Sequence, residues 1–310
     1  MQKRLNFSLM IRYLHNCEID KVKWDNCVGA DCDSLPYGTS WYLDIMSPGW
    51  DALVDGDYSS VFPIPHKRKF GISYIYTPVF LQKLGLYSNE LKSLERLEEF
   101  IRFIPDKYAL TDLCISGRPQ NFKGKIVSRD NYELPLSDMY ENLVGGYTSD
   151  CRRNLKLAET DCLEFPDNFP VNEAVHHFLH GVGEGIKGIK PDSYINLKSL
   201  MNFAINNGYG EIRGVYYKST IIFAMLILKY RNRIIPFLIS TSIESKNRRT
   251  GYFVIDSIIK QYAGGDYILD FAGSSIPGVA SFNRSFGSVN IPYSRLFHSK
   301  LPRLISRFKE

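Results

Sequence analysis

The strongest constraint on the fold is an uninterrupted apolar run, IIFAMLIL, from Ile221 to Leu228. A helix needs about 20 apolar residues to cross a bilayer, so the run is too short for that role. The segments on either side of it, Glu211–Tyr217 and Arg233–Ile243, are rich in β-branched and aromatic residues. The pattern predicts three consecutive strands, of which the first two form a hairpin and the second is buried.

A basic segment, ESKNRRTG (Glu244–Gly251), follows the third strand and contains no large apolar residue. The next segment places apolar side chains at the spacing of one buried helix face: Ile255, Ile258, Ile259 and Tyr262. Gly264 and Gly265 then supply a helix stop signal. Because DYILDF (Asp266–Phe271) returns as a strand, the predicted order is strand, strand, strand, basic loop, helix, strand.

The first half of the chain predicts a similar order. Trp41–Val54, Tyr58–Pro65 and Gly71–Phe80 are expected to be extended, and a loop then leads to a helix and to a strand at Tyr108–Ser116. The helix has an apolar face formed by Leu94, Leu97, Ile101 and Ile104. A helical crossover is expected over Tyr132–Thr160. The sequence therefore predicts an α/β protein (α+β, mixed sheets) with two domains, residues 1–135 and 136–310, and a boundary between 125 and 145.

The composition, 44% hydrophobic and 23% charged, is that of a globular protein. The 6 cysteines are sparse over 310 residues, and the first residues lack the apolar segment of a secretory signal. We therefore expect free thiols in a cytoplasmic protein without a membrane partner. The net charge of +5 is mild, which disfavours a dedicated nucleic-acid binder and favours an anionic ligand. The oligomeric state stays open.

The basic segment has two interpretations. Its cations are simply solvated in the first, which charge alone favours. In the second, the unpaired N–H groups and the dipole of the following helix bind a phosphate group. Lys246, Arg248 and Arg249 would then reinforce the attraction, Gly251 would allow close backbone approach, and Thr250 would cap the helix. The segment lacks the Gly-Lys-Ser/Thr order of a Walker motif, so nucleotide hydrolysis is not expected.

The order of elements resembles the cofactor-binding half of the GNAT (Gcn5-related) N-acyltransferase fold, whose loop carries Gln/Arg-x-x-Gly-x-Gly/Ala. Arg248 and Gly251 match the first two anchors, and Phe253 stands at the third. LDFAGSSIPGVASFNRSFGS (Leu269–Ser288) and CRRNLKLA (Cys151–Ala158) are similar to segments of Fem-type peptidoglycan aminoacyltransferases. Since Fem-type proteins consist of two GNAT-like halves, the resemblance implies two tandem GNAT-like domains, with the cofactor loop in the second.

The resemblance implies an acyltransferase that moves an acyl group from acetyl-CoA or another acyl-CoA to an amine of a small molecule or peptide. It places the backbone amides of Thr241, Ser242 and Ile243 at the acyl carbonyl, and it assigns the cofactor phosphates to Lys246, Arg248, Arg249, Thr250 and Gly251. A Fem-type donor, aminoacyl-tRNA, stays open as an alternative, although the mild net charge disfavours tRNA. A non-catalytic binding protein is a second alternative, favoured by Phe253 and by the absence of a tyrosine at Phe282 or Asn283.

Removal of the amine proton usually falls to a carboxylate, and Glu244 and Asp270 are the candidate bases. Each also has a structural interpretation, because Glu244 can pair with a neighbouring cation and Asp270 can fix the turn that follows it. Tyr293 is the candidate acid for the leaving group. We expect the acceptor to lie between the two halves, near Trp41 and Asp44, with Arg152 available to an anionic substrate.

No metal site is expected. His176 and His180 share a helix face at a spacing that can hold zinc, but the HExxH pattern is absent. Cys27 and Cys32 lack a second Cys/His pair.

Overall fold

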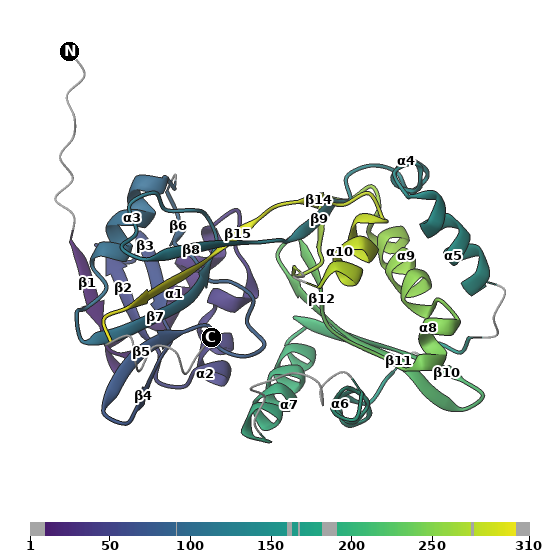
Figure 1. The fold of residues 1–310 in the computed structure, drawn as a ribbon, viewed down its shortest axis with the longest axis horizontal. Coiled ribbons are helices and arrows are strands. Elements are labelled where there is room, and N and C mark those ends of the chain that lie inside the picture. The colour runs from purple at the N-terminus through teal and green to yellow at the C-terminus, as the bar shows by residue number, and fades with distance from the viewer. Residues whose placement is uncertain are drawn as a thin grey trace, which may run out of the picture. The chain divides into compact units, whose positions relative to one another are not determined.

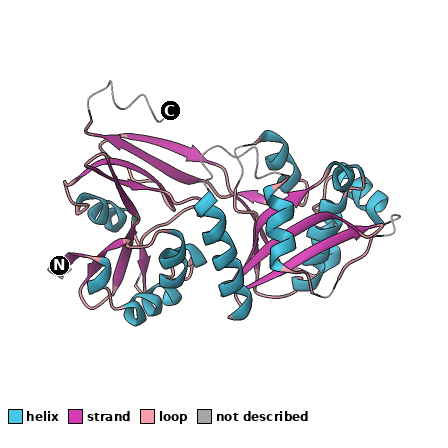
Figure 2. Cartoon of the chain, turned by 90° about the horizontal axis from the view of Figure 1, so that it is seen from below, coloured by secondary structure: helices cyan, strands magenta, loops and turns pink. Residues whose placement is uncertain are grey.

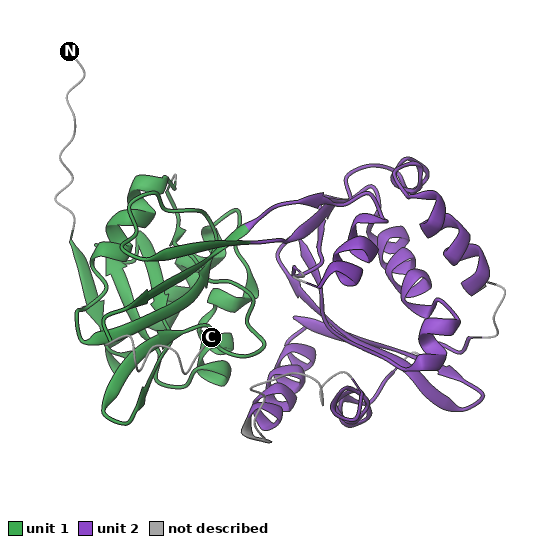
Figure 3. Cartoon of the chain, viewed as in Figure 1, with its two compact units in different colours: residues 1–128, 293–310 green, residues 129–292 purple. Residues whose placement is uncertain are grey.

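The computed structural model describes residues 10–90, 92–159, 163–166, 168–181, 191–273 and 276–301. The chain forms two compact units: unit 1 comprises residues 1–128 and 293–310, and unit 2 comprises residues 129–292 (Figure 3). The C-terminal segment thus groups with the N-terminal half, whereas the sequence analysis assigned everything after residue 135 to the second domain. The difference arises because the last strand hydrogen-bonds into a sheet of unit 1, and strand pairing between distant segments leaves no local sequence signal.

Unit 1 contains two sheets, with the strand orders β1-β2-β3-β6 and β4-β5-β7-β15-β8 (Figure 1). Their strands are β1 (Ile11–Leu14), β2 (Asp51–Asp55), β3 (Ser60–Ile64), β4 (His66–Lys69), β5 (Ile72–Tyr76), β6 (Tyr87–Ser88), β7 (Tyr108–Ile115), β8 (Lys125–Arg129) and β15 (Tyr293–Ser299). The helical elements of this unit are η1 (Asn16–Glu18), α1 (Lys21–Ala30), η2 (Pro36–Gly38), α2 (Ser40–Met46) and α3 (Leu94–Arg102).

The segment that begins at Trp41 is helical in its first half, so the expectation of an extended Trp41–Val54 was wrong there. α2 buries Tyr42, Leu43 and Met46, which lie on one side of a helix. The aromatic and β-branched composition favours a strand locally, but burial of this helical face prevails over that preference. Only the second half of the segment forms a strand, β2.

Unit 2 contains a six-stranded mixed sheet in the order β10-β11-β12-β13-β9-β14. Its strands are β9 (Tyr132–Pro135), β10 (Gly210–Tyr217), β11 (Thr220–Tyr230), β12 (Arg233–Thr241), β13 (Ile268–Asp270) and β14 (Val289–Asn290). Its helices are α4 (Tyr140–Gly145), α5 (Ser149–Glu159), α6 (Val171–Leu179), α7 (Pro191–Asn206), α8 (Ile243–Asn247), α9 (Thr250–Tyr262) and α10 (Pro277–Arg284). The three predicted strands from Glu211 to Ile243 and the helices of the crossover are confirmed.

Residues 221–228 of β11 are apolar without interruption because helices lie on both faces of the sheet of unit 2 (Figure 2). On one face, Ile255 and Ile258 of α9 belong to the same core as Phe223 and Met225 of β11. On the other face, Ser240 of β12 meets His177 of α6, with 2.7 Å between Oγ and Nδ1. Since neighbouring residues of a strand point to opposite faces, α9 and α6 enclose the sheet between them.

The predicted repeat of architecture is present in both units. In unit 1, β5 and β7 pair in parallel and α3 connects them. In unit 2, β12 and β13 pair in parallel, and α8 and α9 lie in the connection. A parallel pair requires such a crossover, so each unit has the strand, helix, strand core that the sequence order predicts.

Candidate functional site

Strands β12 and β13 stay together for only two residue pairs, Arg233 with Ile268 and Ile234 with Leu269. β12 then continues to Thr241, paired on its other side with β11. A pocket of about 560 Å³ lies along this later part of β12, where Ile239 and Thr241 contribute to its lining. The pocket therefore lies beside a part of β12 that β13 does not pair with.

The pocket is apolar on one side and polar on the other. Its apolar lining consists of Phe223, Met225, Ile239, Tyr252, Ile255, Val279 and Phe282. Its polar lining comes from the end of β12 and from α8 and the start of α9: Thr241, Ser245, Lys246, Arg249 and Gly251. The structure thus brings together four residues that the sequence analysis assigned to the cofactor, Thr241, Lys246, Arg249 and Gly251.

The basic segment is largely helical, so the prediction of a loop between Glu244 and Gly251 was wrong in conformation. Ser242 begins α8 as its N-cap, with its Oγ accepting the N–H of Ser245 at 3.0 Å. Arg249 then adopts a left-handed backbone (φ 60°) as the N-cap residue of α9. Thr250 is therefore the first residue inside α9 rather than its cap, because a single left-handed residue suffices to separate the two helices.

Arg249 braces the junction between α8 and α9. Its Nε donates to Oδ1 of Asn154 on α5 at 3.2 Å. Its Nη1 donates to the carbonyl of Lys246 at 3.1 Å and to the carbonyl of Asn247. These carbonyls belong to the last turn of α8, where helical carbonyl groups run out of i+4 partners. Asn154 belongs to the CRRNLKLA segment, so one motif of the Fem-type resemblance meets the basic segment at this contact.

The other two cations of the segment differ in their surroundings. Arg248 is engaged, since its Nε lies 2.7 Å from Oε1 of Glu244 and its guanidinium stacks 3.3 Å from the centre of the Tyr217 ring. Lys246 is exposed, lines the pocket, and makes no ion pair among the described residues. Of these two cations, Lys246 is the one available to an anionic ligand.

Two buried hydroxyl groups of α8 and α9 have no hydrogen-bond partner in the described part of the chain, Oγ of Ser245, which lines the pocket, and Oγ1 of Thr250, which directly precedes the pocket-lining Gly251. Ser245 is 1% exposed and Thr250 is 0% exposed. A buried polar group without a partner costs about 1–3 kcal/mol, which a ligand oxygen can recover. Thr250 is the first residue of α9, where the first backbone N–H groups and the helix dipole also attract negative charge.

Asp270 lies in a buried ionic network at the other end of β12. Its Oδ2 is 3.2 Å from Nη1 of Arg233, which is also 3.0 Å from Oε1 of Glu133. Its Oδ1 accepts the N–H of Ala272 at 2.9 Å. Because the side chain is buried, paired and bonded to the following turn, this geometry favours the structural interpretation of Asp270 over its role as a base.

The remaining predicted residues are spread over both units. Glu244 lies on α8 with 44% of its side chain exposed, next to the pocket-lining Ser245. Arg152 lies on α5 and donates to the carbonyl of Val144 at 3.3 Å. Asp44, Trp41 and Tyr293 belong to unit 1, where Asp44 accepts from Nζ of Lys21 at 2.6 Å. A shared acceptor site for residues of the two units stays a prediction.

Tyr252 is a pocket residue that the sequence analysis did not single out. Its ring contacts that of Phe282, with 4.8 Å between centroids, and burial raises the pKa of Tyr252 while a hydrogen bond with Asn154 opposes the increase. The one sequence feature that could have indicated Tyr252 is its position directly after Gly251. The next residue, Phe253, stacks on Phe165 at 4.9 Å and does not line the pocket, because consecutive helix residues face different directions.

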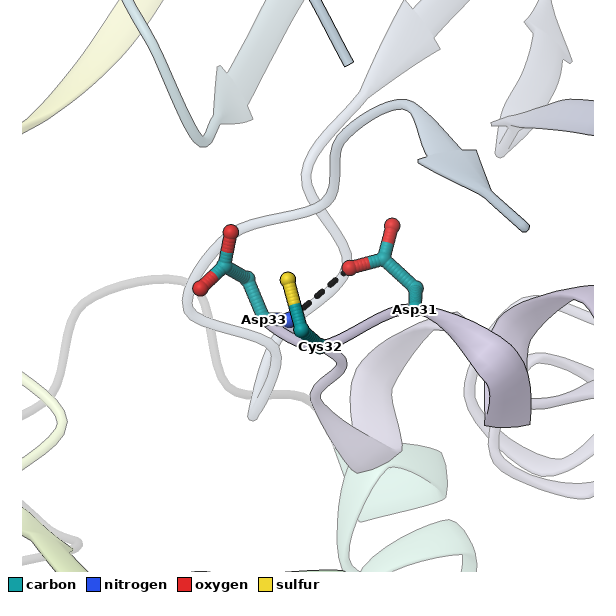
Figure 4. Close-up of side chains that lie close together, drawn as sticks. All are labelled: Asp31, Cys32 and Asp33. Atoms are coloured by element: carbon teal, nitrogen blue, oxygen red, sulfur yellow. Dashed lines mark hydrogen bonds between the residues drawn. The ribbon is translucent and has the colours of Figure 1, made fainter. Parts of the chain in front are cut away.

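One group of potential metal ligands occurs in the described ranges, Asp31, Cys32 and Asp33, whose ligand atoms lie within 4.8 Å of one another (Figure 4). Asp31 already accepts from Nζ of Lys92 at 2.7 Å, from the N–H of Ser88 at 3.0 Å and from the N–H of Asp33 at 2.9 Å. These bonds give the buried Asp31 carboxylate a structural role in the fold of unit 1.

No helix in the described ranges is both long and apolar enough to cross a membrane. No family model matches the chain, and no curated protein matches its sequence.

Solved structures, in contrast, match over most of the chain at low sequence identity. FemX has 11% identity and a TM-score of 0.63, with 96% of this chain and 99% of that chain covered. The C-terminal domain of a protein assigned as a lysylphosphatidylglycerol synthetase from Agrobacterium fabrum has 10% identity, a TM-score of 0.58, and coverage of 93% and 94%. A tandem GNAT protein from the clavulanic acid biosynthesis pathway has 9% identity, a TM-score of 0.50, and coverage of 94% and 99%. The chain therefore has the GNAT-like tandem fold, in the form found in Fem-type proteins.

Proposed function

We propose that the protein is an acyltransferase whose unit 2 binds an acyl-CoA donor in the pocket at the start of α9 and transfers the acyl group to an amine. One observation carries the proposal. Lys246 and the buried hydroxyl of Ser245, neither of which has an ion-pair or hydrogen-bond partner among the described side chains, line one 560 Å³ pocket whose other lining is largely apolar, and Thr250, whose buried hydroxyl also lacks a described partner, directly precedes the pocket-lining Gly251. Acyl-CoA combines an anionic pyrophosphate with a long, mostly uncharged arm, so it matches both halves of this lining.

The chain's own groups account for binding of each part of the donor. The pyrophosphate would lie against Nζ of Lys246, the hydroxyls of Ser245 and Thr250, and the first N–H groups of α9. The uncharged arm would lie along β12, between Ile239 and the side chains of α10. Arg249 would act mainly by holding the α8–α9 junction in place, since its donors already meet Asn154 and two carbonyl groups.

Transfer requires attack of a neutral amine on the thioester carbonyl, so that a C–N bond forms, the C–S bond breaks, and the thiolate receives a proton. The amide of Ser242 is bonded to the carbonyl of Ile222 at 2.9 Å, whereas the amide of Ile243 has no backbone partner in the described ranges. We assign the oxyanion contact to the amide of Ile243, the first residue of α8. Glu244 is the adjacent carboxylate, and we assign it the role of general base.

Calorimetric titration with acetyl-CoA tests donor binding. The Lys246→Gln variant should bind about 10-fold more weakly, because a hydrogen bond to a charged group contributes about 1.5–3 kcal/mol. Lys198→Gln is the matched control, since Lys198 is an exposed lysine on α7 away from the pocket lining. Absence of binding at millimolar acetyl-CoA in a folded sample would overturn the proposal.

Activity on a panel of small amines and peptides tests the chemistry separately. Glu244→Gln should retain donor binding and lose most of the rate, because general-base catalysis contributes on the order of 100-fold or more. An unchanged rate in Glu244→Gln would refute its role as the base, and a wild-type protein that binds acetyl-CoA but modifies no amine of the panel would be a binding protein without this chemistry.

Aminoacyl-tRNA is the second candidate donor, because the likeness in fold to FemX extends over 96% of this chain. This donor would be favoured if the protein binds aminoacyl-tRNA with an affinity that falls steeply as salt is added, and does not bind acetyl-CoA. The two donors thus predict opposite results with the same sample.

A further inference from the structure

Strands β4 and β5 form a hairpin (Figure 1), and its turn carries an aromatic residue in a backbone conformation that such residues avoid. Lys69 pairs with Ile72, so Phe70 and Gly71 form a two-residue hairpin turn. Both have positive φ, 51° for Phe70 and 78° for Gly71. Turns of this geometry normally carry Asn or Asp before the glycine, because a bulky side chain at positive φ is strained.

The Phe70 side chain gains little packing in exchange for this strain. It is 91% exposed, more than any other large apolar side chain in the described part of the protein. Its ring contacts Lys69 of the same turn, whose Nζ lies 5.2 Å from the ring centre. Single exposed apolar residues are common, but one that is also held in a strained turn indicates a role outside folding.

Three consecutive cations, Lys67, Arg68 and Lys69, stand directly behind this aromatic tip and are exposed. Lys67 lies 4.5 Å from the ring centre of Tyr76, and Arg68 donates to the carbonyl of Gly71 at 3.4 Å. None of the three forms an ion pair with a described residue. Because neighbouring residues of a strand alternate in direction, Arg68 points to one face of the hairpin and the two lysines to the other.

We propose that this hairpin attaches the protein to the surface of an anionic lipid bilayer. Phe70 would enter the interface between headgroups and acyl chains, and the cations of both faces would contact lipid phosphates around it. The sequence analysis expected no membrane partner because no apolar segment can span one, but attachment to the surface needs no such segment.

The arrangement favours a planar anionic surface over single-stranded RNA. An RNA strand lies along one face of a protein and stacks its bases on aromatic rings there. In this hairpin the cations are divided between both faces, the aromatic residue is at the tip, and one face of its ring is next to Lys69. An end-on approach to a surface uses all four side chains at once.

Sedimentation of the whole chain with vesicles tests the proposal. Vesicles of equal parts phosphatidylglycerol and phosphatidylcholine should bind the protein, whereas pure phosphatidylcholine vesicles should not. Replacing the three cations with glutamine should weaken binding about 100-fold, since each contributes about a 5-fold factor near an anionic surface. The control replaces three other exposed cations of unit 1, Arg118, Lys123 and Lys125, with glutamine and should change binding far less.

Phe70→Asn separates membrane attachment from structure. Asn suits the turn better than Phe, so the variant should unfold at a higher temperature and yet bind anionic vesicles about 10-fold more weakly. The proposal is overturned if anionic vesicles do not bind the wild-type protein, or if Phe70→Asn and the triple variant bind them as well as wild type does. Hairpin-dependent binding of a uridine oligonucleotide without vesicle binding would overturn it in favour of RNA.

Discussion

The buried network of Arg233, Asp270 and Glu133 supplies the sharpest test of how unit 2 is held together. Nη1 of Arg233 lies 3.0 Å from Glu133 and 3.2 Å from Asp270, and the side chains of Arg233, Glu133 and Asp270 are 8%, 11% and 1% exposed. One cation thus balances two carboxylates. Arg233→Met keeps much of the side-chain volume but leaves both carboxylates buried without this cation, and the expected loss of stability is about 3–5 kcal/mol.

Asp270→Asn is the matched comparison. The Asn oxygen can still accept the N–H of Ala272, and Arg233 keeps Glu133 as its ionic partner. The expected loss is therefore the difference between one charged and one neutral hydrogen bond, about 1–2 kcal/mol. If Asp270 were the catalytic base instead, Asp270→Asn would abolish activity in a protein of unchanged stability.

The distribution of tryptophan makes the assay specific to each unit. Trp24, Trp41 and Trp50 all lie in unit 1, so tryptophan fluorescence follows unit 1 while far-ultraviolet circular dichroism follows both units. In urea, Arg233→Met should shift the dichroism transition to lower denaturant and separate it from the fluorescence transition. A shift of less than about 1 kcal/mol, or one equal to that of Asp270→Asn, would refute this account.

Three further predictions concern other parts of the molecule. Burial alone would raise the pKa of Asp51, but hydrogen bonds from His66 and Tyr13 outweigh it and lower the pKa to about 2. Asp51 therefore adds about 2 kcal/mol of stability, which is present above pH ~4 and is lost as the pH falls through ~2. The stabilities of wild type and Asp51→Asn, measured by acid titration, should converge there. Burial raises the pKa of the Cys27 and Cys151 thiols to about 11. Mass spectrometry should therefore show slow alkylation of both thiols under mildly alkaline conditions, while the exposed Cys17 and Cys32 react quickly. Asn154→Ala should weaken acetyl-CoA binding several-fold, because it releases Arg249. The neighbouring Arg153→Ala should leave the affinity unchanged, because both side chains of the Arg153–Asp150 ion pair are exposed. Equal acetyl-CoA affinities for the two variants would contradict the role of Asn154 in holding Arg249.

Elements with strong periodicity were predictable from the sequence. β10, β11 and β12 and helices α3 and α9 combine apolar patterns with clear stop signals, and their local preference agrees with their burial. Helix α2 was not predictable from composition, because its aromatic residues favour a strand until Tyr42, Leu43 and Met46 are buried together. Hairpin strand β4 was missed as well, since its turn carries Phe70 where a hairpin signal normally has Asn or Asp.

The sequence pointed to a segment that lines the pocket, but not to the contacts within it, and the role of this segment as a cofactor site stays a prediction. The charge and glycine of the Glu244–Gly251 segment located the pocket, yet which cations stay available depended on partners distant in sequence. Arg248 is engaged by Tyr217, and Arg249 by Asn154. The orphan hydroxyl groups of Ser245 and Thr250 had no sequence signal, because burial without a partner in the described ranges is a property of the packed structure.

The motifs that carry the Fem-type resemblance make contacts that hold the elements of unit 2 together. Asn154 of the Arg-Arg-Asn segment holds Arg249 at the start of α9, and Asp270 of the Asp-Phe segment joins Arg233 at the point where β12 and β13 are still paired. Beyond Ile234, β12 pairs with β11 alone, and the pocket lies along its later part, at Ile239 and Thr241. Lys246, Ser245 and Glu244 lie outside these motifs, and we expect them to determine what binds and reacts there.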